Sequence, residues 1–428
     1  MNSYKENSKD IVYNGSSIGV KNDVSYQGFL GSSFFYSSFK QVLNLFQKKG
    51  CSEPNISGEL PVLSSSTSTS SNSPVLYLDN IAINDCNTPD RCGHVVQRFL
   101  EHFDAELRYH SKPLVDCYSE SGKYALASKI HPFVCALEPI LMVLPAFPCK
   151  SPNNRDKVLG VLPDRTEELG LLRIESFCAD VAQYYPQGCQ LTIVSDGRVF
   201  ADLIGVKDEL VSVYNNFLEF TLFKSRGGLK HIIFRSLDDH LAAINIDDLE
   251  VGQAGENFDI HDKRRAGLME IFTDADKAEA ISNTMVNLGF VRYLEEDLVW
   301  PAGMSKTKKK KECRQIARKM MERNVAFSRL CEHHYPTHLR LSIHGYNSSG
   351  PKFPIQMSPN LRGPTPWHSV CLEFKDGKTA FVKRKVAAQL VKDGDFELYE
   401  HPEFKRPWGF RQLESSYIDF ESVVTKIL

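Results

Sequence analysis

The clearest chemical pattern in this chain is a short segment in which apolar and polar side chains alternate. In order, its members are Leu339, Arg340, Leu341, Ser342, Ile343 and His344. Successive side chains of a β-strand point to opposite faces, so the segment predicts a strand with one apolar and one polar face. We expect Arg340 and Ser342 to bind a phosphorylated or carboxylated small molecule, and His344 to act in catalysis. Burying an arginine without a partner is costly, which favours the functional interpretation, and a solvent-facing edge is the alternative.

A second histidine stands in the segment Thr-Pro-Trp-His at 365–368. His368 precedes an apolar strand pattern and is a candidate general acid or base. Trp367 is a candidate to pack against a substrate ring, and Thr365 is a candidate for substrate binding. A core tryptophan beside a capping histidine explains the same residues equally well, so both interpretations stay open.

A lysine, a hydroxyl group and amides surround a proline at 150–154. Lys150 can bind an anion, and a lysine with a depressed pKa can also form an imine with a carbonyl compound. Ser151 and Asn153 are candidates for substrate binding. The alternative is an exposed loop lysine, and only the company of the other motifs favours the functional interpretation.

Three carboxylates complete the candidate site. Asp196 follows the apolar run 191–194, and ligands of α/β sheets bind beyond the carboxyl ends of the strands. Asp196 could therefore hold an amine or a hydroxyl group, although Ser-Asp-Gly is also an ordinary turn sequence. Asp164 and Glu167 precede a helical pattern and predict a capping box, which could also fix a neighbouring lysine.

Strand-like and helix-like segments alternate between these motifs, which predicts an α/β sheet. We expect helices at 167–185, 211–223, 277–288 and from 306 to before Pro336, and strands at 190–194, 230–235 and 339–344. Gly289 stands where a helix C-cap is expected. The lysines at 306–311 suit a solvated helix start better than a nucleic-acid site.

Composition divides the chain into a flexible Ser/Asn-rich extension at 1–85 and a folded domain at 86–428. The formal net charge of -2 gives no overall field for nucleic acid, so a small molecule is the expected partner. The 11 cysteines, without a C-x-x-C pair, fit reduced thiols and no zinc site. Since no run of about 18 apolar residues occurs, we expect a cytoplasmic protein without membrane contact.

Five motifs in order resemble the pyoverdine/dityrosine biosynthesis family, the isocyanide (isonitrile) synthases, and are most similar to its fungal dityrosine branch. The motifs are L-P-A-F-P-C-K-S-P-N, V-L-P-D-R-T-E, Y-P-Q-G-C-Q-L-T-I-V-S-D-G-R-V-F, L-R-L-S-I-H and T-P-W-H-S-V. The resemblance spans about 130–415. It implies a Rossmann-like core sheet flanked by helices. It also implies an enzyme that turns the α-amine of an aromatic amino acid, usually tyrosine, into an isonitrile or N-formyl group.

The resemblance further implies ribulose 5-phosphate as the carbon donor and no metal or nicotinamide cofactor. The amine must condense with a sugar ketone, for which His344 and His368 are the acid/base candidates. Lys150 and Arg340 are the candidates for the phosphate, and Asp196 for the ammonium group. The chain departs from the family in the residue before Glu167, where Thr166 replaces the common glycine.

Two other functions stay open at this point. One is a different phosphosugar or amino-acid transferase on the same fold, and the other is a non-catalytic protein that binds tyrosine derivatives during wall assembly. The product pathway would be a dityrosine wall component or a metal-binding secondary metabolite, with a separate downstream oxidase. Decarboxylation, the preferred amino acid and the oligomeric state do not follow from the sequence.

Overall fold

All residues that the computed structural model describes lie within one compact unit of the chain, Ser73–Leu428. They are residues 91–107, 118–224, 228–242, 259–274, 276–277, 285–344, 351–360 and 363–427. The predicted extension at 1–85 lies outside the described residues, so that prediction is not tested.

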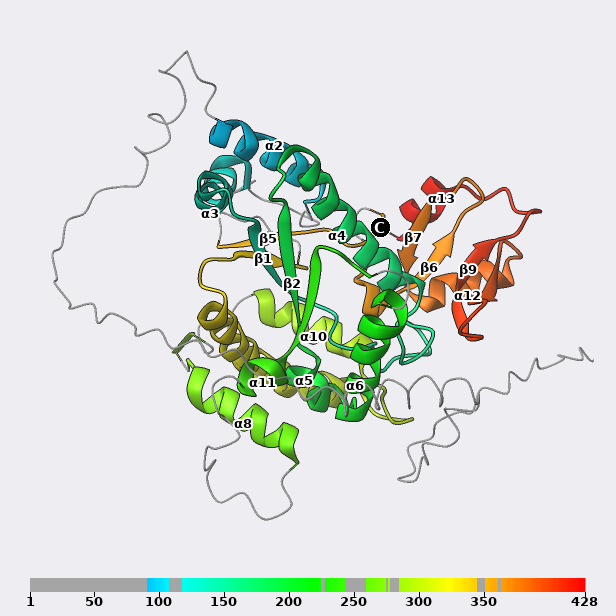
Figure 1. The fold of residues 1–428 in the computed structure, drawn as a ribbon. Coiled ribbons are helices and arrows are strands. Elements are labelled where there is room, and N and C mark those ends of the chain that lie inside the picture. Colours follow the sequence, from blue (N-terminus) through cyan, green and yellow to red (C-terminus); the bar gives the residue numbers. More distant parts are fainter. Residues whose placement is uncertain are drawn as a thin grey trace, which may run out of the picture. The chain divides into compact units, whose positions relative to one another are not determined.

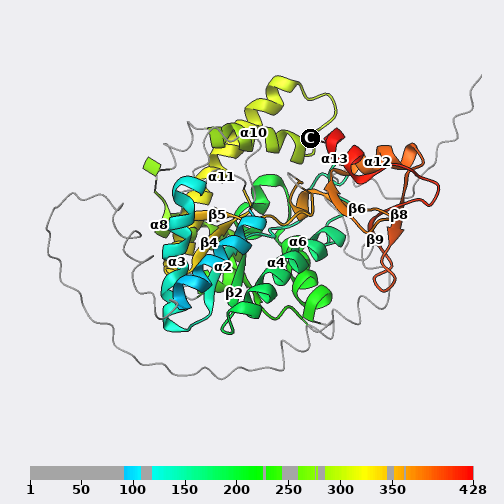
Figure 2. The same ribbon diagram turned by 90° about the horizontal axis from the view of Figure 1, so that it is seen from above.

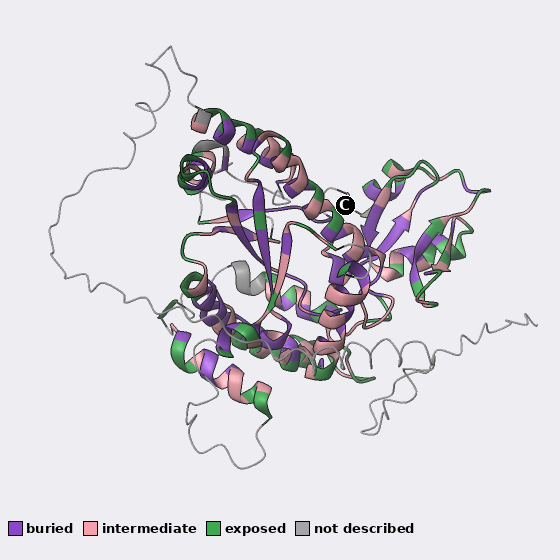
Figure 3. Cartoon of the chain, in the orientation of Figure 1, coloured by how far each residue is buried: buried purple, intermediate pink, exposed green. Residues whose placement is uncertain are grey.

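A parallel sheet with the strand order β3-β2-β1-β4-β5 forms the centre of the described part (Figure 1). Its strands are β1 Ile140–Pro145, β2 Cys189–Ser195, β3 Ile232–Ser236, β4 Leu339–Ser342 and β5 Lys352–Pro354. Every pairing in this sheet is parallel. The inner strands are mostly buried (Figure 3), as the continuous apolar run of β1 requires. The predicted α/β class is therefore confirmed.

Helices connect the strands, because parallel neighbours need crossover connections. They are α2 Arg91–Ala105, η3 Tyr118–Gly122, α3 Lys123–Ala136, α4 Arg165–Tyr184, α5 Gly197–Phe200, η4 Ala201–Ile204, α6 Asp208–Asn216, η5 Phe217–Phe223, α7 Leu237–Ala242, α8 Ile260–Phe272, α10 Met285–Asp297 and α11 Lys306–His334. Val143 and Val194 of the sheet pack in one apolar cluster with residues of α7, α8 and α11. In α2 and α4, the rings of Phe99, Phe103 and Phe177 pack edge to face.

A second, four-stranded sheet follows in the C-terminal part, with the order β7-β6-β9-β8 (Figure 2). Its elements are η8 Pro366–His368, β6 Val370–Glu373, β7 Thr379–Val382, α12 Arg384–Lys392, β8 Phe396–Glu400, β9 Pro407–Gln412 and α13 Phe420–Ile427. This sheet has its own apolar cluster, which α12 and α13 complete. Arg165 of α4 contacts Glu373 of β6 at 2.7 Å, which ties the two sheets together.

Three boundaries differ from the predicted ones. The helix predicted at 211–223 is confirmed, but its second half is the π-helix η5. Gly289 does not end a helix: it lies inside α10, because Val291 and Leu294 continue the apolar face that packs on α11. Part of the helix predicted at 277–288 lies outside the described residues. The strand predicted at 339–344 ends at Ser342.

Within the described ranges, no helix has both the length and the apolar character needed to cross a membrane.

Candidate functional site

Two predicted site residues, Asp196 and Arg340, come within electrostatic reach of each other across β1 of the central sheet. Asp196 directly follows β2, and Arg340 lies on β4 beside Val143 of β1. The charge of Arg340 acts on the Asp196 carboxyl group and lowers its pKa against the larger effect of burial. Parallel strands therefore bring together a carboxylate and a guanidinium that are 144 residues apart in sequence, the difference between 340 and 196.

Gly197 determines where the Asp196 backbone lies. A Cβ atom on Gly197 would lie 2.0 Å from the carbonyl oxygen of Pro148, so no larger residue fits without a backbone shift. The Ser195 hydroxyl group also donates a hydrogen bond of 3.0 Å to the Phe147 carbonyl group. The end of β2 is thus held against the loop 146–151, which follows β1.

Asp196 is half-buried, and its Oδ1 atom is buried without a hydrogen-bond partner among the described residues. Burial raises its pKa to about 7, while its own backbone N–H and then Arg340 partly offset this increase. Asp196 is the N-cap residue of α5, but its side chain makes no capping hydrogen bond. The turn interpretation therefore explains its backbone and leaves its carboxyl group available for a ligand.

Arg340 carries two buried nitrogens, Nε and Nη1, without a hydrogen-bond partner in the described part of the chain. Its guanidinium contacts the Cys331 thiol of α11 and lowers the pKa of that thiol, although burial raises it more. Lys352 of β5 pairs with Arg340 in the strand register and donates a hydrogen bond of 2.9 Å to Ser328. Burial, and then the Arg340 charge, lowers the Lys352 pKa to about 8. Two cations thus lie side by side on β4 and β5, and the lysine is hydrogen-bonded to α11.

The other polar members of the β4 pattern lie apart from Arg340. Ser342 is half-buried, and its hydroxyl group accepts a hydrogen bond of 3.2 Å from the His344 backbone N–H. His344 is exposed and lies past the end of β4. The alternation is therefore confirmed for Arg340 and Ser342, but it does not extend to His344, because the chain turns after the strand.

Lys150 lies in a fully enclosed polar network. Its ammonium group is 3.0 Å from Asp164 Oδ2 and 2.8 Å from Glu167 Oε2, and all three side chains have at most 1% exposure. Tyr214 donates a hydrogen bond of 3.1 Å to Glu167. Burial is the main cause of a raised Glu167 pKa, and Lys150 opposes it. We assign Lys150 a structural role in the site, because its ammonium group already forms ion pairs with two carboxylates.

The same carboxylates form the predicted capping box of α4. The Asp164 side chain accepts a hydrogen bond of 3.0 Å from the Thr166 backbone, and Glu167 accepts one of 2.9 Å from the Asp164 backbone. The capping prediction is confirmed, and so is the expectation that a carboxylate there fixes a lysine. Lys150 and Thr166 also donate to the Pro366 carbonyl group at 3.2 and 2.8 Å, which anchors η8.

His368 of η8 faces a second set of polar groups. Its Nδ1 atom lies 2.6 Å from the Tyr293 hydroxyl oxygen and 2.7 Å from the Thr365 hydroxyl oxygen. Its Nε2 atom lies 3.6 Å from Asp297 Oδ2. Burial lowers the His368 pKa well below its usual value, with smaller contributions from Lys157 and Lys150. His368 is therefore a neutral imidazole in contact with two hydroxyl groups.

The remaining predicted residues support this second set. Trp367 is buried and packs against the Phe147 ring at 5.2 Å, as the core interpretation expected. Ser151 is buried, and its hydroxyl group donates a hydrogen bond of 2.6 Å to Asp297. Asn153 donates to the Glu296 backbone at 2.6 Å, so it fixes the end of α10.

Cys149, in the loop 146–151, lies within electrostatic reach of both sets. Burial raises the pKa of the Cys149 thiol, and the charges of Asp196 and Asp297 raise it further. The charges of both carboxylates therefore act on one buried thiol. The pair Asp196 and Arg340 and the polar groups around His368 are thus neighbouring parts of one polar region.

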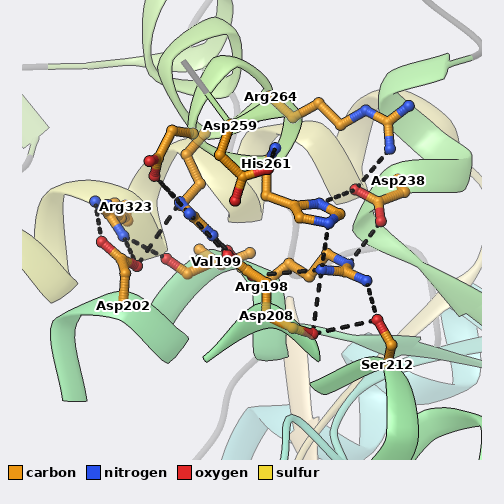
Figure 4. A network of polar contacts seen from close by, with 12 residues as sticks. Arg198, Val199, Asp202, Asp208, Ser212, Asp238, Asp259, His261, Arg264 and Arg323 are labelled. Atoms are coloured by element: carbon orange, nitrogen blue, oxygen red, sulfur yellow. Dashed lines mark hydrogen bonds and ion pairs between the residues drawn. The ribbon is translucent and has the colours of Figure 1, made fainter. Parts of the chain in front are cut away.

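An ion-pair network around Arg198 connects the helices that follow Asp196 in the sequence (Figure 4). Arg198 Nε lies 2.6 Å from Asp238 of α7, and Arg265 of α8 contacts Asp208 of α6 at 3.0 Å. Arg265 also donates to the Arg198 carbonyl group at 3.2 Å. This network joins α5 to three neighbouring helices and so limits how far the segment after Asp196 can move.

Sequence reasoning missed four polar residues of this region: Lys157, Tyr293, Asp297 and Lys352. Lys157 donates a hydrogen bond of 2.7 Å to Asp297, and its ammonium group lies 4.5 Å from the centre of the Tyr293 ring. Tyr293 and Asp297 are four residues apart, and this spacing places them on one face of a helix. The sequence spacing indicates that the two residues share a helix face, but only the tertiary contact with His368 indicates that they belong to a site.

Fold and site define a class: an α/β protein with a parallel sheet and a polar region at its strand ends. Among the described residues, no group of three or more His, Cys, Asp or Glu side chains is arranged to hold a metal ion. The sequence model described as pyoverdine/dityrosine biosynthesis protein matches residues 130–393. The chain belongs to this family.

Three relatives illustrate the family. The chain is 34% identical over 259 residues to the L-tryptophan isonitrile synthase AmbI2 of Fischerella ambigua, which covers 60% of the chain and 74% of that protein. It is 35% identical over 300 residues to the spore wall maturation protein DIT1 of Saccharomyces cerevisiae, covering 60% and 56%. The crystal structure of PvcA from Pseudomonas aeruginosa superposes with a TM-score of 0.64 and 28% identity, covering 74% of this chain and all of that one.

Proposed function

We propose that this chain converts the α-amine of an aromatic amino acid into an isonitrile or N-formyl group, with ribulose 5-phosphate as the carbon donor. The relatives named above include a tryptophan isonitrile synthase, and the L-tyrosine isonitrile synthase of Xenorhabdus nematophila is 33% identical over 250 residues. L-Tyrosine is the first substrate to test. A separate oxidase would then modify the product, as dityrosine formation requires an oxidation.

One observation carries this proposal: the carboxyl group that follows β2 and the guanidinium on β4, the two strands that flank β1, each present buried atoms without a hydrogen-bond partner among the described residues. A carboxylate suits the ammonium group of an amino acid, and a guanidinium suits a phosphate or carboxylate. We assign Asp196 to the amine. We assign the anion to Arg340 with Lys352, because Lys150 is already neutralised.

His368 supplies the acid/base group that the condensation of an amine with a ketone needs. Its pKa is held well below the usual value, so it is neutral and can accept a proton at neutral pH. His344 is exposed and lies beyond β4, and we give it no role in the first condensation.

The test is mass spectrometry of purified protein incubated with L-tyrosine and ribulose 5-phosphate labelled at its ketone carbon. We expect a labelled isonitrile or N-formyl product, and we expect Arg340→Met to lose both sugar-phosphate binding and product. Exposed Lys319 offers the matched control, because Lys319→Met removes a cation from the outer face of α11. If tyrosine, tryptophan and phenylalanine all give no labelled product, the proposal is wrong and a binding role replaces it.

A further inference from the structure

Tyr293, His368 and Asp297 form an array that the sequence motifs did not predict. Tyr293 Oη and Asp297 Oδ2 lie on opposite sides of the imidazole, 2.6 Å from Nδ1 and 3.6 Å from Nε2. Tyr293 and Asp297 both come from α10, whereas His368 comes from η8. A hydroxyl group, an imidazole and a carboxylate in this order resemble the arrangement by which hydrolases activate a serine.

The hydrogen-bond partners assign the imidazole tautomer. Two hydroxyl groups, those of Tyr293 and Thr365, approach Nδ1, and either can donate to it only if Nδ1 carries no proton. The proton of the neutral ring then belongs on Nε2, which faces Asp297. The distance of 3.6 Å exceeds a hydrogen bond, but such contacts often tighten when a substrate binds.

Asp297 is held for this task by groups on its other oxygen. Ser151 donates 2.6 Å and Lys157 donates 2.7 Å to Oδ1, which leaves Oδ2 for the imidazole. The side chain of Asp297 is only 2% exposed. The carboxylate therefore has a fixed orientation, as a group that holds a histidine requires.

Thr365 makes the array asymmetric. Nδ1 has one lone pair, so two hydroxyl groups compete for it and one hydroxyl hydrogen is left over. A phenol ionises near pH 10, far more readily than an aliphatic alcohol. Tyr293 is also only half-buried, so a substrate can reach its oxygen. Of the two hydroxyl groups, that of Tyr293 is the better proton carrier.

The geometry points to Tyr293 as a catalytic acid and base that exchanges protons with His368, while Asp297 positions the imidazole. This inference rests on the proposed function, since it names the group that moves protons during the condensation. It assigns Tyr293 to the reacting amine and ketone, and it assigns Asp297 no direct contact with them.

The proton steps balance over the condensation. Tyr293 takes one proton from the substrate ammonium group and gives its own proton to Nδ1 of His368, so a free amine forms beside an imidazolium. The amine adds to the ketone carbon, and a proton moves from nitrogen to oxygen within the adduct, which is a carbinolamine. The proton stored on His368 then returns through Tyr293 to the hydroxyl group, which leaves as water and leaves an iminium ion. No oxidant or external acid is consumed.

The charges around the imidazole suit a transient proton. Asp297 favours the imidazolium, whereas Lys157 and Lys150 oppose it, and Lys157 also lies 4.5 Å from the centre of the Tyr293 ring. An ammonium group at that place stabilises a developing phenolate. The proton is therefore accepted during reaction but not retained at rest.

The test uses Tyr293→Phe in the full-length protein, because phenylalanine keeps the ring and its contact with Lys157. We expect kcat with L-tyrosine and ribulose 5-phosphate to fall about 100-fold or more, with KM for both within about threefold. Asp297→Asn should lower kcat and shift the acidic limb of the pH–rate profile, since an amide cannot offset an imidazolium charge.

Tyr184→Phe is the matched control. The Tyr184 ring lies 4.7 Å from the Arg98 guanidinium, so it also packs against a cation, but it belongs to α4 and not to this array. We expect Tyr184→Phe to keep wild-type kcat. A Tyr293→Phe variant that also keeps wild-type kcat overturns the inference.

Nitrogen-15 NMR of the imidazoles separates this inference from the proposed function. The His368 signals are identified by their loss in His368→Gln. We expect Nδ1 to be unprotonated, and its resonance to move in Tyr293→Phe but not in Tyr184→Phe. A protonated Nδ1 overturns the inference even if the wild type forms product. An unprotonated Nδ1 that responds to Tyr293→Phe, in a wild type that forms no product, overturns the proposed function while it confirms the hydrogen-bonded array.

Discussion

Two buried groups of charges in this chain differ in one respect: whether their atoms have partners. Lys150, Asp164 and Glu167 contact one another at 3.0 Å or less, and Tyr214 completes the group. Asp196 and Arg340 are also buried at their polar atoms, yet Oδ1 of the acid and two nitrogens of the guanidinium have no hydrogen-bond partner among the described residues. The first group can stabilise the fold, whereas the second pays a desolvation cost that a ligand would recover.

This difference separates scaffold from site more clearly than residue type does. Lysine and arginine were both predicted to bind the phosphate, and sequence alone treats them alike. Only their partners distinguish them. Lys150 forms ion pairs with two carboxylates, whereas the neighbour of Arg340 is a thiol. The comparison predicts opposite effects on stability when the two groups are changed.

The largest effect is expected from Lys150→Met. Removing the ammonium group leaves Asp164 and Glu167 buried without their counter-charge, which costs about 3–5 kcal/mol of unfolding free energy. The Lys150 hydrogen bond to the Pro366 carbonyl group of η8 is lost as well, while that of Thr166 remains. Urea unfolding followed by circular dichroism measures the loss, with Lys319→Met as an exposed control expected within about 0.5 kcal/mol of wild type. A loss of the control's size for Lys150→Met would contradict the scaffold role.

A smaller loss is expected from Gly197→Ala. The new Cβ atom would meet the Pro148 carbonyl oxygen, so the backbone must shift at a cost of about 1–3 kcal/mol. The shift also moves Asp196, so binding of L-tyrosine should weaken. Gly160→Ala is the control, because no atom lies within 4 Å of its Cβ position. Calorimetric titration of both variants tests this, and unchanged tyrosine affinity in Gly197→Ala would argue against Asp196 as the amine ligand.

The third prediction is that the affinity for L-tyrosine depends on pH. Asp196 has a pKa of about 7 and holds an ammonium group only when ionised. Because deprotonation is required, affinity for L-tyrosine should rise about tenfold from pH 6 to pH 8. The substrate ammonium group keeps its proton over this range, so the change reports the protein. Calorimetry at three pH values tests the prediction, and an affinity that is flat in wild type would exclude Asp196.

Much of this architecture follows from local sequence, because periodicity and caps depend on near neighbours. The apolar run of β2, the long helix before Pro336 and the Asp164 capping box were all predictable for that reason. The second sheet was visible only as alternation at its first strand. Tyr293 escaped prediction because its partner, His368, is 75 residues away in sequence.

His344 shows the opposite limit. It continues the alternation of β4 in sequence, but the strand ends two residues earlier and the histidine is exposed. A pattern with period two indicates which side chains share a face only while the strand lasts. Pairing with β1 and β5 determines that length, and pairing is a tertiary property.

The most direct test of the central claim is the unfolding free energy of Asp196→Asn at pH 8, with and without L-tyrosine. The raised Asp196 pKa means that the folded state binds a proton more tightly than the unfolded state, so stability falls as pH rises toward 7 and the cost is complete above it. Asparagine removes this cost, so the ligand-free variant should be more stable than wild type by up to about 4 kcal/mol, the free energy that corresponds to a pKa raised from 3.8 to about 7.

With L-tyrosine at about 100 times its Kd, wild type should gain about 2.7 kcal/mol, and the variant should gain nothing at the same concentration. Glu209→Gln, on the exposed side of α6, should behave as wild type in both conditions. A ligand-free Asp196→Asn protein that is less stable than wild type, or one that L-tyrosine still stabilises in full, would contradict the account.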